Sequence, residues 1–180
     1  MGKNLPFKDH EFDYVICCQV LEHVENPERF LAEQFRVARR GFLETPSLIG
    51  EYLFPRESHK WIIHEMNGIT YLVDKKKINF TYGYDMGELI QNYLPTHSIG
   101  FKILEQTHPN LITNRVEWKD SFDFVVDPTD PEILKYFTGK WQEQWADAFF
   151  PPKTKWEELK DSSRAFLNMT RSVLRNKRYR

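Results

Sequence analysis

The sequence is short of cysteine, of clustered glycine and of long apolar runs, and each shortage excludes a class of protein. Its two cysteines, Cys17 and Cys18, are adjacent, so on a strand their side chains point to opposite faces. This excludes a disulfide framework and a cysteine-based zinc site, and we expect a reducing, cytoplasmic location. The eight glycines stand singly, without the G-x-G-x-x-G pattern of a nucleotide-binding loop. The longest uncharged, predominantly apolar run, Tyr14 to Leu21, is too short to span a membrane.

The rest of the composition fits a folded protein with little net charge. At 180 residues, with 41% hydrophobic and 15% aromatic residues, the chain has material for one domain with an appendage. The net charge of −1 argues against a general polyanion binder. Basic residues do cluster from Arg171 to Arg180. They either grip RNA or another anionic surface or form a solvated helix end, and we favour the second. Lys75 to Lys77 either form a solvated face or contact a phosphate, and we favour the solvated face.

One stretch near the start predicts a strand, a loop and the beginning of a helix. Phe12 to Cys18 is a short, nearly continuous apolar run, typical of a central parallel strand that is covered on both faces. Asn26 can cap the following helix. Pro27 suits the first helical position because proline has no N–H to lose there.

The same stretch continues into a second strand. The spacing of apolar residues predicts a helix to about Arg39, stopped by Gly41, followed by a strand from Phe42 to Pro46. A strand, a helix and a strand in so few residues form a βαβ unit, which implies a parallel sheet.

Several short motifs follow one another at consistent spacing in the first 47 residues. They are Leu5-Pro6-Phe7, Phe12-Asp13-Tyr14-Val15, Val20-Leu21-Glu22-His23-Val24, Asn26-Pro27, Phe30-Leu31, Glu33, Arg36-Val37 and Glu44-Thr45-Pro46. This series resembles the middle of a class I S-adenosylmethionine-dependent methyltransferase of the type 11 group. Such proteins carry an LPF loop, an FDxV strand, a leucine-(glutamate or histidine)-His-Val turn and an E-x-x-RV helix in this order. The resemblance implies a methyltransferase that uses S-adenosylmethionine.

The resemblance also implies that only the later half of the domain is present. In the family, a glycine-rich loop after the first strand and an acidic residue ending the second strand hold the cofactor, and both precede the LPF loop. Here Met1 to Asn4 stands in that place. We therefore expect a partial Rossmann-like α/β sheet made of strands 4 to 7, with an inserted β-hairpin and C-terminal helices. We also expect this truncated domain to be inactive by itself.

By resemblance, the cofactor lies beside the end of the first predicted strand. Leu5 and Pro6 border its adenine side. The residues that border its methionine side are Cys18, Gln19, Val20 and Leu21. His23 is the candidate base, because a neutral imidazole accepts a proton near pH 7; the alternative is a loop histidine that is hydrogen-bonded to the backbone. Methyl transfer needs alignment of the reacting atoms more than it needs a catalytic group.

The substrate side is expected after the second strand and around the start of the hairpin. Its candidate residues are Glu44, Thr45, His59 and Trp61. Glu44 either orients the substrate or simply caps the strand end. His59 and His64 are five positions apart, which on a strand places them on opposite faces, so we expect no metal site.

Further short elements follow Pro46. Ser47 to Phe54 predicts one or two helical turns, and Asn67-Gly68 between two β-rich runs predicts a hairpin over residues 60–74. The other expected elements are a helix from Met86 to Tyr93 ended by Pro95, strands at Phe101–Glu105, Leu111–Trp118 and Phe122–Val126, a helix from Asp130 to Phe137, a helix with the stripe Trp141, Trp145 and Phe149, and a last helix capped by Thr154 and Glu157 and running to about Arg175. Two of the three strands resemble the antiparallel pair that ends the class I sheet.

These expectations divide the chain into a methyltransferase-like half-domain at residues 1–126 and a helical extension at 127–180. In the class I strand order 3-2-1-4-5-7-6, the Phe12–Cys18 strand would lack its outer neighbour, which is an association hazard. We expect a homodimer, a partner chain or the helix with the Trp141 stripe to cover that edge. Two functions compete: a methyltransferase whose cofactor site is completed elsewhere, and a non-catalytic binding or regulatory protein on the same scaffold. Nucleic acid is not the favoured partner.

Overall fold

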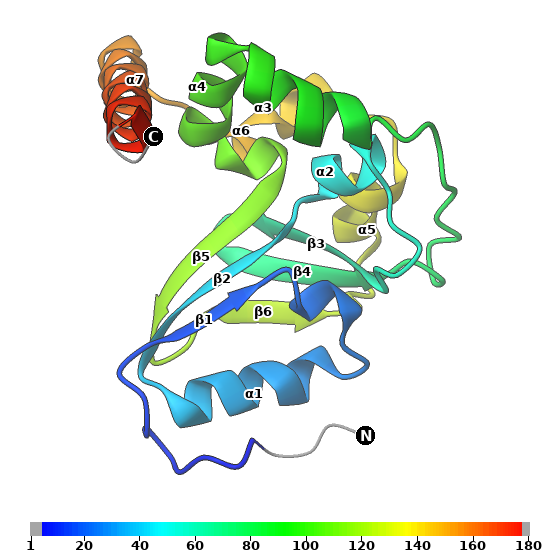
Figure 1. Ribbon diagram of the computed structural model, residues 1–180. Helices are drawn as coiled ribbons and strands as arrows, with labels where there is room; N and C mark the ends of the chain where they lie inside the picture. Colours follow the sequence, from blue (N-terminus) through cyan, green and yellow to red (C-terminus); the bar gives the residue numbers. More distant parts are fainter. Residues whose placement is uncertain (1–4, 178–180) are drawn as a thin grey trace.

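The computed structural model describes residues 5–177 and shows a mixed α/β fold with two three-stranded sheets (Figure 1). In the first sheet, β1 (Val15–Cys18) pairs in parallel with β2 (Arg40–Pro46), and β5 (Thr113–Lys119) pairs antiparallel with β2. Helix α1 (Pro27–Val37) joins β1 to β2, which confirms the predicted βαβ unit. The order β1-β2-β5 fits places 4, 5 and 7 of the class I sheet.

The second sheet is built on the predicted hairpin. Strand β3 (Trp61–Met66) pairs antiparallel with β4 (Ile69–Asp74), and β6 (Asp123–Val126) pairs in parallel with β4. Asn67 and Gly68 form the turn with φ of 54° and 80°, the left-handed conformation that Asn-Gly turns accept. The hairpin is therefore confirmed.

Two clusters of buried side chains hold the elements together. The first lies between the sheets and α1 and contains Cys17, Leu21, Leu31, Leu43, Trp61, Ile63 and Leu72. The second joins the far side of the hairpin to α2 (Leu48–Leu53), α5 (Pro131–Thr138) and α6 (Ala146–Phe149). Its buried members are Leu48, Ile62, Met66, Val73, Phe137, Trp145 and Phe149. The hairpin thus contributes to both clusters and is the most completely covered element of the fold.

The remaining helices are mostly short. They are η1 (Leu21–His23), η2 (Glu88–Tyr93), α3 (Leu94–His97), α4 (Ile99–Thr107), η3 (Pro109–Leu111), η4 (Glu143–Trp145) and α7 (Lys155–Lys177). Figure 1 shows α7 at the edge of the molecule, beside α4. Its capping box is confirmed, since the backbone N–H of Glu157 donates to Thr154 Oγ1 and the N–H of Thr154 donates to Glu157 Oε2. Among residues 5–177, no helix is both long and apolar enough to cross a bilayer.

Two predictions about secondary structure are wrong. Phe101–Glu105 is part of helix α4 and not a strand, because Ser98 caps a helix there by accepting the N–H of Phe101 and because α4 packs against α7. A short apolar run is compatible with either structure, and tertiary packing decides. The predicted stop at Pro95 is also wrong, since π-helix η2 continues into α3. There Pro95 is the second residue of α3, directly after the π-helical turn, where the helical hydrogen-bonding pattern changes.

The end of α1 differs from the prediction as well. The helix ends at Val37, and Gly41, expected to stop it, lies within β2. A Cβ at Gly41 would stand 2.5 Å from Cζ2 of Trp118 on the neighbouring β5, so glycine is needed there for the close approach of the indole ring.

The sequence predicts one sheet made of strands 4 to 7, but the structure has two separate sheets. The strands predicted at Leu111–Trp118 and Phe122–Val126 form, but as β5 and β6 they belong to different sheets and are not an antiparallel pair. The connection after β5 is tight, with Asp120 at a φ of 64°, and carries the chain from one sheet to the other. The loss of Phe101–Glu105 as a strand leaves β5 as the last strand of the first sheet.

The helix with the Trp141 stripe does not cover β1. Trp145 and Phe149 are buried in the second core cluster, against the hairpin, and Trp141 precedes the helix and is exposed. The basic cluster predicted from Arg171 to Arg180 begins with a residue whose side chain the structure describes. The side chains after Arg171 lie outside the described part of the chain.

Strand β1 itself is not covered on both faces. Cys17 is buried in the first core cluster, but the neighbouring Ile16 is 68% exposed on the opposite face. Other apolar side chains exposed around β1 are Phe7, Phe12, Tyr14 and Val20. The sequence of β1 is that of a central strand, whereas within residues 5–177 it lies at the edge of its sheet and pairs only with β2.

Candidate functional site

Polar side chains gather beyond the carboxyl ends of β1 and β2, the edge where open α/β sheets bind ligands. After β1, Gln19 adopts a φ of 55° and its N–H donates to the Glu44 carbonyl at 2.8 Å, which turns the chain into η1. Leu21 is fully buried and fixes η1 in the core. The neighbouring residues Glu22 and His23 are thereby directed toward the loop that precedes β3.

Two backbone-directed contacts hold that loop against η1. The N–H of Lys60 donates to the Glu22 carbonyl at 2.8 Å, and the Trp61 indole N–H donates to the Val24 carbonyl at 2.7 Å. Residues 58–61 therefore lie beside η1 although they are far from it in sequence. This brings His59 to His23.

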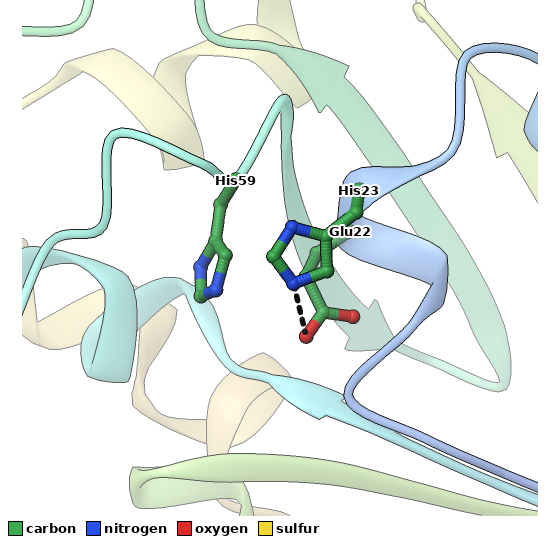
Figure 2. A group of neighbouring side chains, drawn as sticks. All are labelled: Glu22, His23 and His59. Carbon is green, nitrogen blue, oxygen red and sulfur yellow. Dashed lines mark ion pairs between the residues drawn. The ribbon is translucent and has the colours of Figure 1, made fainter.

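The two histidines form the centre of the site (Figure 2). Their ring centroids lie 4.8 Å apart in an edge-to-face arrangement. His23 Nδ1 is 2.9 Å from the Ser58 carbonyl oxygen, and His59 Nδ1 is 2.6 Å from Glu51 Oε2. Because a carbonyl only accepts, Nδ1 of His23 carries the proton, and the lone pair of the neutral ring is on Nε2.

Glu22 lies directly beneath the His23 ring. Its side chain is 1% exposed, and Oε1 lies 3.9 Å from His23 Nε2, too far for a hydrogen bond. Neither carboxylate oxygen has a hydrogen-bond partner among the residues that the structure describes. Burial raises the pKa of Glu22, because the charged form loses its hydration. Such a buried, unpaired carboxylate is uncommon in folded proteins.

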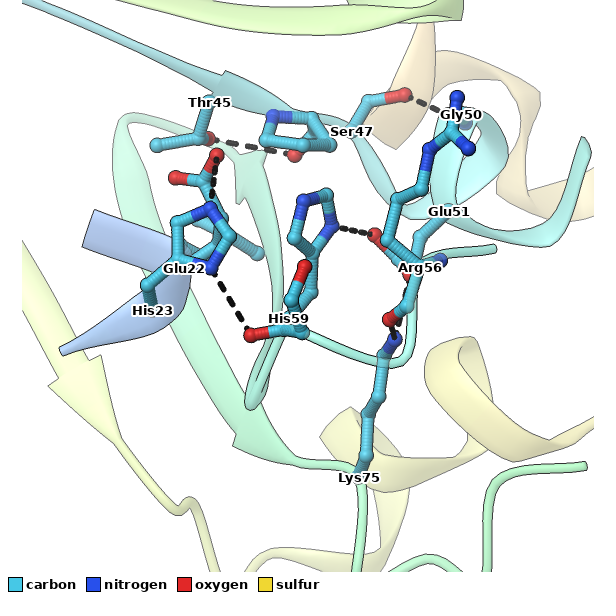
Figure 3. Close-up of polar contacts among 12 residues, drawn as sticks. Glu22, His23, Thr45, Ser47, Gly50, Glu51, Arg56, His59 and Lys75 are labelled. Carbon is cyan, nitrogen blue, oxygen red and sulfur yellow. Dashed lines mark hydrogen bonds and ion pairs between the residues drawn. The ribbon is translucent and has the colours of Figure 1, made fainter. Parts of the chain in front are cut away.

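A buried ion pair supports His59 from behind (Figure 3). Glu51 Oε1 accepts from Lys75 Nζ at 2.5 Å and from the Arg56 N–H at 3.0 Å, while Oε2 faces His59. Burial alone would raise the pKa of Glu51, but the hydrogen bonds from His59 and Lys75 hold it below the ordinary value. Lys75 is only 6% exposed, so the prediction of a solvated lysine run is wrong for this residue.

The residues predicted on the cofactor side lie in two places. Leu5 and Pro6 run along α1, where the Leu5 N–H donates to Glu33 Oε2 at 2.7 Å. Cys18, Gln19 and Val20 are exposed at the end of β1 and can form one wall of a cofactor site, whereas the Leu21 side chain belongs to the core. The exposed residues of the predicted cofactor side thus lie at the end of β1, and the sequence contains no G-x-G-x-x-G loop.

The four residues predicted on the substrate side do not lie together in the structure. Glu44 pairs with Arg115 at 2.9 Å across the β2–β5 ladder. Thr45 is fully buried and accepts from the Asn114 amide at 3.1 Å, and Trp61 is buried in the first core cluster. Of the four predicted residues, only His59 joins His23.

Sequence reasoning missed three members of the site: Glu22, Glu51 and Lys75. Glu22 stands beside His23 in the leucine-Glu-His-Val turn, so the motif itself was the signal. Glu51 and Lys75 are 24 positions apart, and no local pattern connects them. The rejected pair of His59 and His64 does stay apart, because His64 is buried against the Phe149 ring in the second cluster.

The arrangement has two chemical capacities. Nε2 of His23 can accept a proton, since Nδ1 is engaged and the side chain is 40% exposed. The donor atoms offered by Glu22, His23 and His59 also lie within 4.8 Å of one another, so these three residues could hold a metal ion.

Comparison with known proteins identifies the first part of the chain. Residues 2–43 match the family described as a methyltransferase domain. The chain is 50% identical over 40 residues to an uncharacterized protein of Methanocaldococcus jannaschii, which is 22% of this chain and 20% of that protein. It is 47% identical over 38 residues to norajmaline N-methyltransferase of Rauvolfia serpentina, which is 21% of this chain and 13% of the enzyme.

The family match covers residues 2–43, which include β1, α1 and the start of β2. The stretches shared with the two relatives span a fifth or less of each of those proteins. No solved structure matches the chain significantly. The α/β fold agrees with the family, since β1, α1 and β2 form the parallel unit that the matched residues encode. Residues 2–43 are thus part of a class I S-adenosylmethionine-dependent methyltransferase-type domain.

Proposed function

We propose that this chain is the acceptor-side half of an S-adenosylmethionine-dependent methyltransferase, with a cofactor site completed by residues outside these 180. The observation that carries the proposal is the open side of β1. Ile16, on the face away from the core, is 68% exposed. Strand β1 also has the apolar sequence of a central strand, but within residues 5–177 it pairs only with β2 and its other edge is unpaired. In the class I order, the strand that carries the glycine-rich loop would pair with this edge.

The wall at the end of β1 supports the same proposal. Cys18, Gln19 and Val20 are exposed there, next to η1 and its histidine. A cofactor held between this wall and a glycine-rich loop would stand at the carboxyl edge of the sheet, where His23 and His59 meet. The missing residues come either from upstream in the same polypeptide or from a partner chain. A homodimer would also cover the β1 edge, but it would not add a glycine-rich loop.

His23 is the residue of this chain that we assign to proton transfer. S-adenosylmethionine, when bound, supplies an electrophilic methyl group. A hydroxyl or amine acceptor loses a proton during transfer, and His23 Nε2 can take it because the Ser58 carbonyl holds Nδ1 in its protonated state. Glu51 orients His59 on the other side of the acceptor position. We place the reaction in the cytoplasm, in keeping with two free cysteines.

Calorimetric titration with S-adenosylhomocysteine tests the proposal, with the mass of the protein in solution recorded alongside. The 180-residue chain should give no binding heat at millimolar ligand. Micromolar binding, about −8 kcal/mol, by the monomer would contradict the proposal, because it would mean that the site is complete within the chain. Micromolar binding by a dimer would equally contradict it. If the chain with its missing half supplied also fails to bind, the scaffold serves a non-catalytic binding role.

A further inference from the structure

Three potential metal ligands from two separate segments meet at one point. Glu22 and His23 come from η1, and His59 comes from the loop before β3. Their donor atoms lie within 4.8 Å of one another. Figure 2 shows the two imidazole rings facing each other, with the Glu22 carboxylate below His23.

Both histidines are oriented as metal ligands usually are. A metal-binding histidine normally donates its second ring N–H to a carbonyl or carboxylate, which fixes the tautomer and the ring orientation. Here Nδ1 of His23 faces the Ser58 carbonyl at 2.9 Å, and Nδ1 of His59 faces Glu51 Oε2 at 2.6 Å. In each ring the nitrogen left for a ligand is Nε2, so a bound ion would take the place of the proton that His23 Nε2 accepts in the metal-free site.

Glu22 provides the second, independent observation. Its side chain is 1% exposed, and both carboxylate oxygens lack a hydrogen-bond partner within residues 5–177. Lys75, the buried lysine of the adjoining network, is engaged by Glu51 Oε1 at 2.5 Å. A cation held between these three residues would give the buried carboxylate its missing partner.

We propose that Glu22, His23 and His59 bind a divalent first-row transition metal ion, for which Zn²⁺ is the probe. Two imidazoles and one carboxylate form a donor set that suits Zn²⁺, whereas Mg²⁺ and Ca²⁺ prefer oxygen ligands throughout. Three protein ligands leave a fourth position open, as in catalytic zinc sites. The exposed edge of His23 places that position toward solvent.

The geometry allows the site to close on an ion. Zinc ligands at about 2.0–2.2 Å in a tetrahedron lie about 3.3 Å from one another. The largest separation here is 4.8 Å, so closure needs a movement of about 1.5 Å. His23 can make this movement, because it is the exposed member of the three, while Glu22 and His59 are held by burial.

Titration of the chain with Zn²⁺ by calorimetry, and with Co²⁺ by visible absorption, tests this site. We expect one ion per chain at micromolar affinity or tighter, with the intense absorption of four-coordinate cobalt. Glu22→Gln and His23→Gln should each weaken binding at least about 100-fold. Glu51→Gln should weaken it about 10- to 100-fold, because Glu51 acts through His59.

Two matched variants provide the controls. Glu25→Gln changes an exposed carboxylate three positions after Glu22, and His97→Gln changes an exposed histidine on α3. Both should bind Zn²⁺ as the unchanged protein does. Absence of Zn²⁺ uptake, or equal affinities for Glu22→Gln and Glu25→Gln, would overturn the proposal. The titration uses no methyl donor, so its failure would leave the proposed methyltransferase role intact.

Discussion

The two sheets of this protein differ in how completely they are covered. In the hairpin sheet, Ile62, Ile63, Leu72 and Val73 are each at most 1% exposed, and helices or the other sheet lie against both faces. In the first sheet, β1 buries Cys17 on one face and exposes Ile16 on the other. The hairpin β3–β4 is therefore covered on both faces, whereas one face of β1 is open.

The polar site lies at the junction of these two regions. Its supports, Glu51 and Lys75, are buried, whereas His23, which follows β1, is 40% exposed. A binding site needs side chains that are held rigidly by their neighbours, together with an opening through which the ligand can enter. The following changes separate the contributions of the two sides.

The largest effect is expected on the covered side, from Lys75→Met. This change leaves the Glu51 carboxylate buried without its cation, and we expect the free energy of unfolding to fall by about 3–5 kcal/mol. Lys77→Met is the control, because Lys77 is an exposed lysine paired with Asp127, and it should cost less than about 1 kcal/mol. Urea unfolding of both variants checks the difference. Equal losses would contradict the buried pair.

The second prediction compares the loss of stability caused by one substitution in each sheet. Ile63→Ala should lower the free energy of unfolding by about 2–4 kcal/mol, because it opens a cavity in the first core cluster. Ile16→Ala should cost less than about 1 kcal/mol, because little apolar surface at that position is removed from water. Urea unfolding at low protein concentration measures both values. A loss at Ile16 as large as at Ile63 would show that β1 is covered.

A smaller, pH-dependent effect is expected from His64. Burial lowers the pKa of His64 to about 4, below the ordinary value of about 6.5. Between those values the unfolded chain binds a proton that the folded chain does not, so stability is lost as the pH falls from about 6.5 to about 4. The loss should reach about 2 kcal/mol at pH 5. His64→Leu should remove this component, which urea unfolding at pH 7 and pH 5 measures; an unchanged pH slope would refute it.

What the sequence could predict followed from local patterns. Asn67-Gly68 marks its turn with two adjacent residues, and Asn26-Pro27 marks the start of α1, so both elements form as expected. The prediction of a strand at Phe101–Glu105 is wrong because a short apolar run fits a strand as well as a helix. The contacts that decide for a helix come from α7, about fifty residues later in the chain.

The site was only partly predictable for the same reason. His23 lies in a recognisable motif, but its neighbour His59 was placed on a strand, whereas it lies in the loop before β3. The meeting of these rings depends on the Lys60 N–H bonding the Glu22 carbonyl, a contact between distant segments. The burial of Lys75 could not be predicted because a run of three lysines is typical of a solvated surface. Only the structure shows that Lys75 pairs with the buried Glu51.

Hydrogen exchange of the backbone amides of β1 and β4, at high dilution, tests the central difference between the sheets most directly. Strand β4 lies between β3 and β6, so its amides should be protected. The β1 amides on the side away from β2 should exchange at nearly the rate of exposed backbone. Protection of β1 equal to that of β4 would contradict this account, because it would mean that the outer edge of β1 is already paired within the chain.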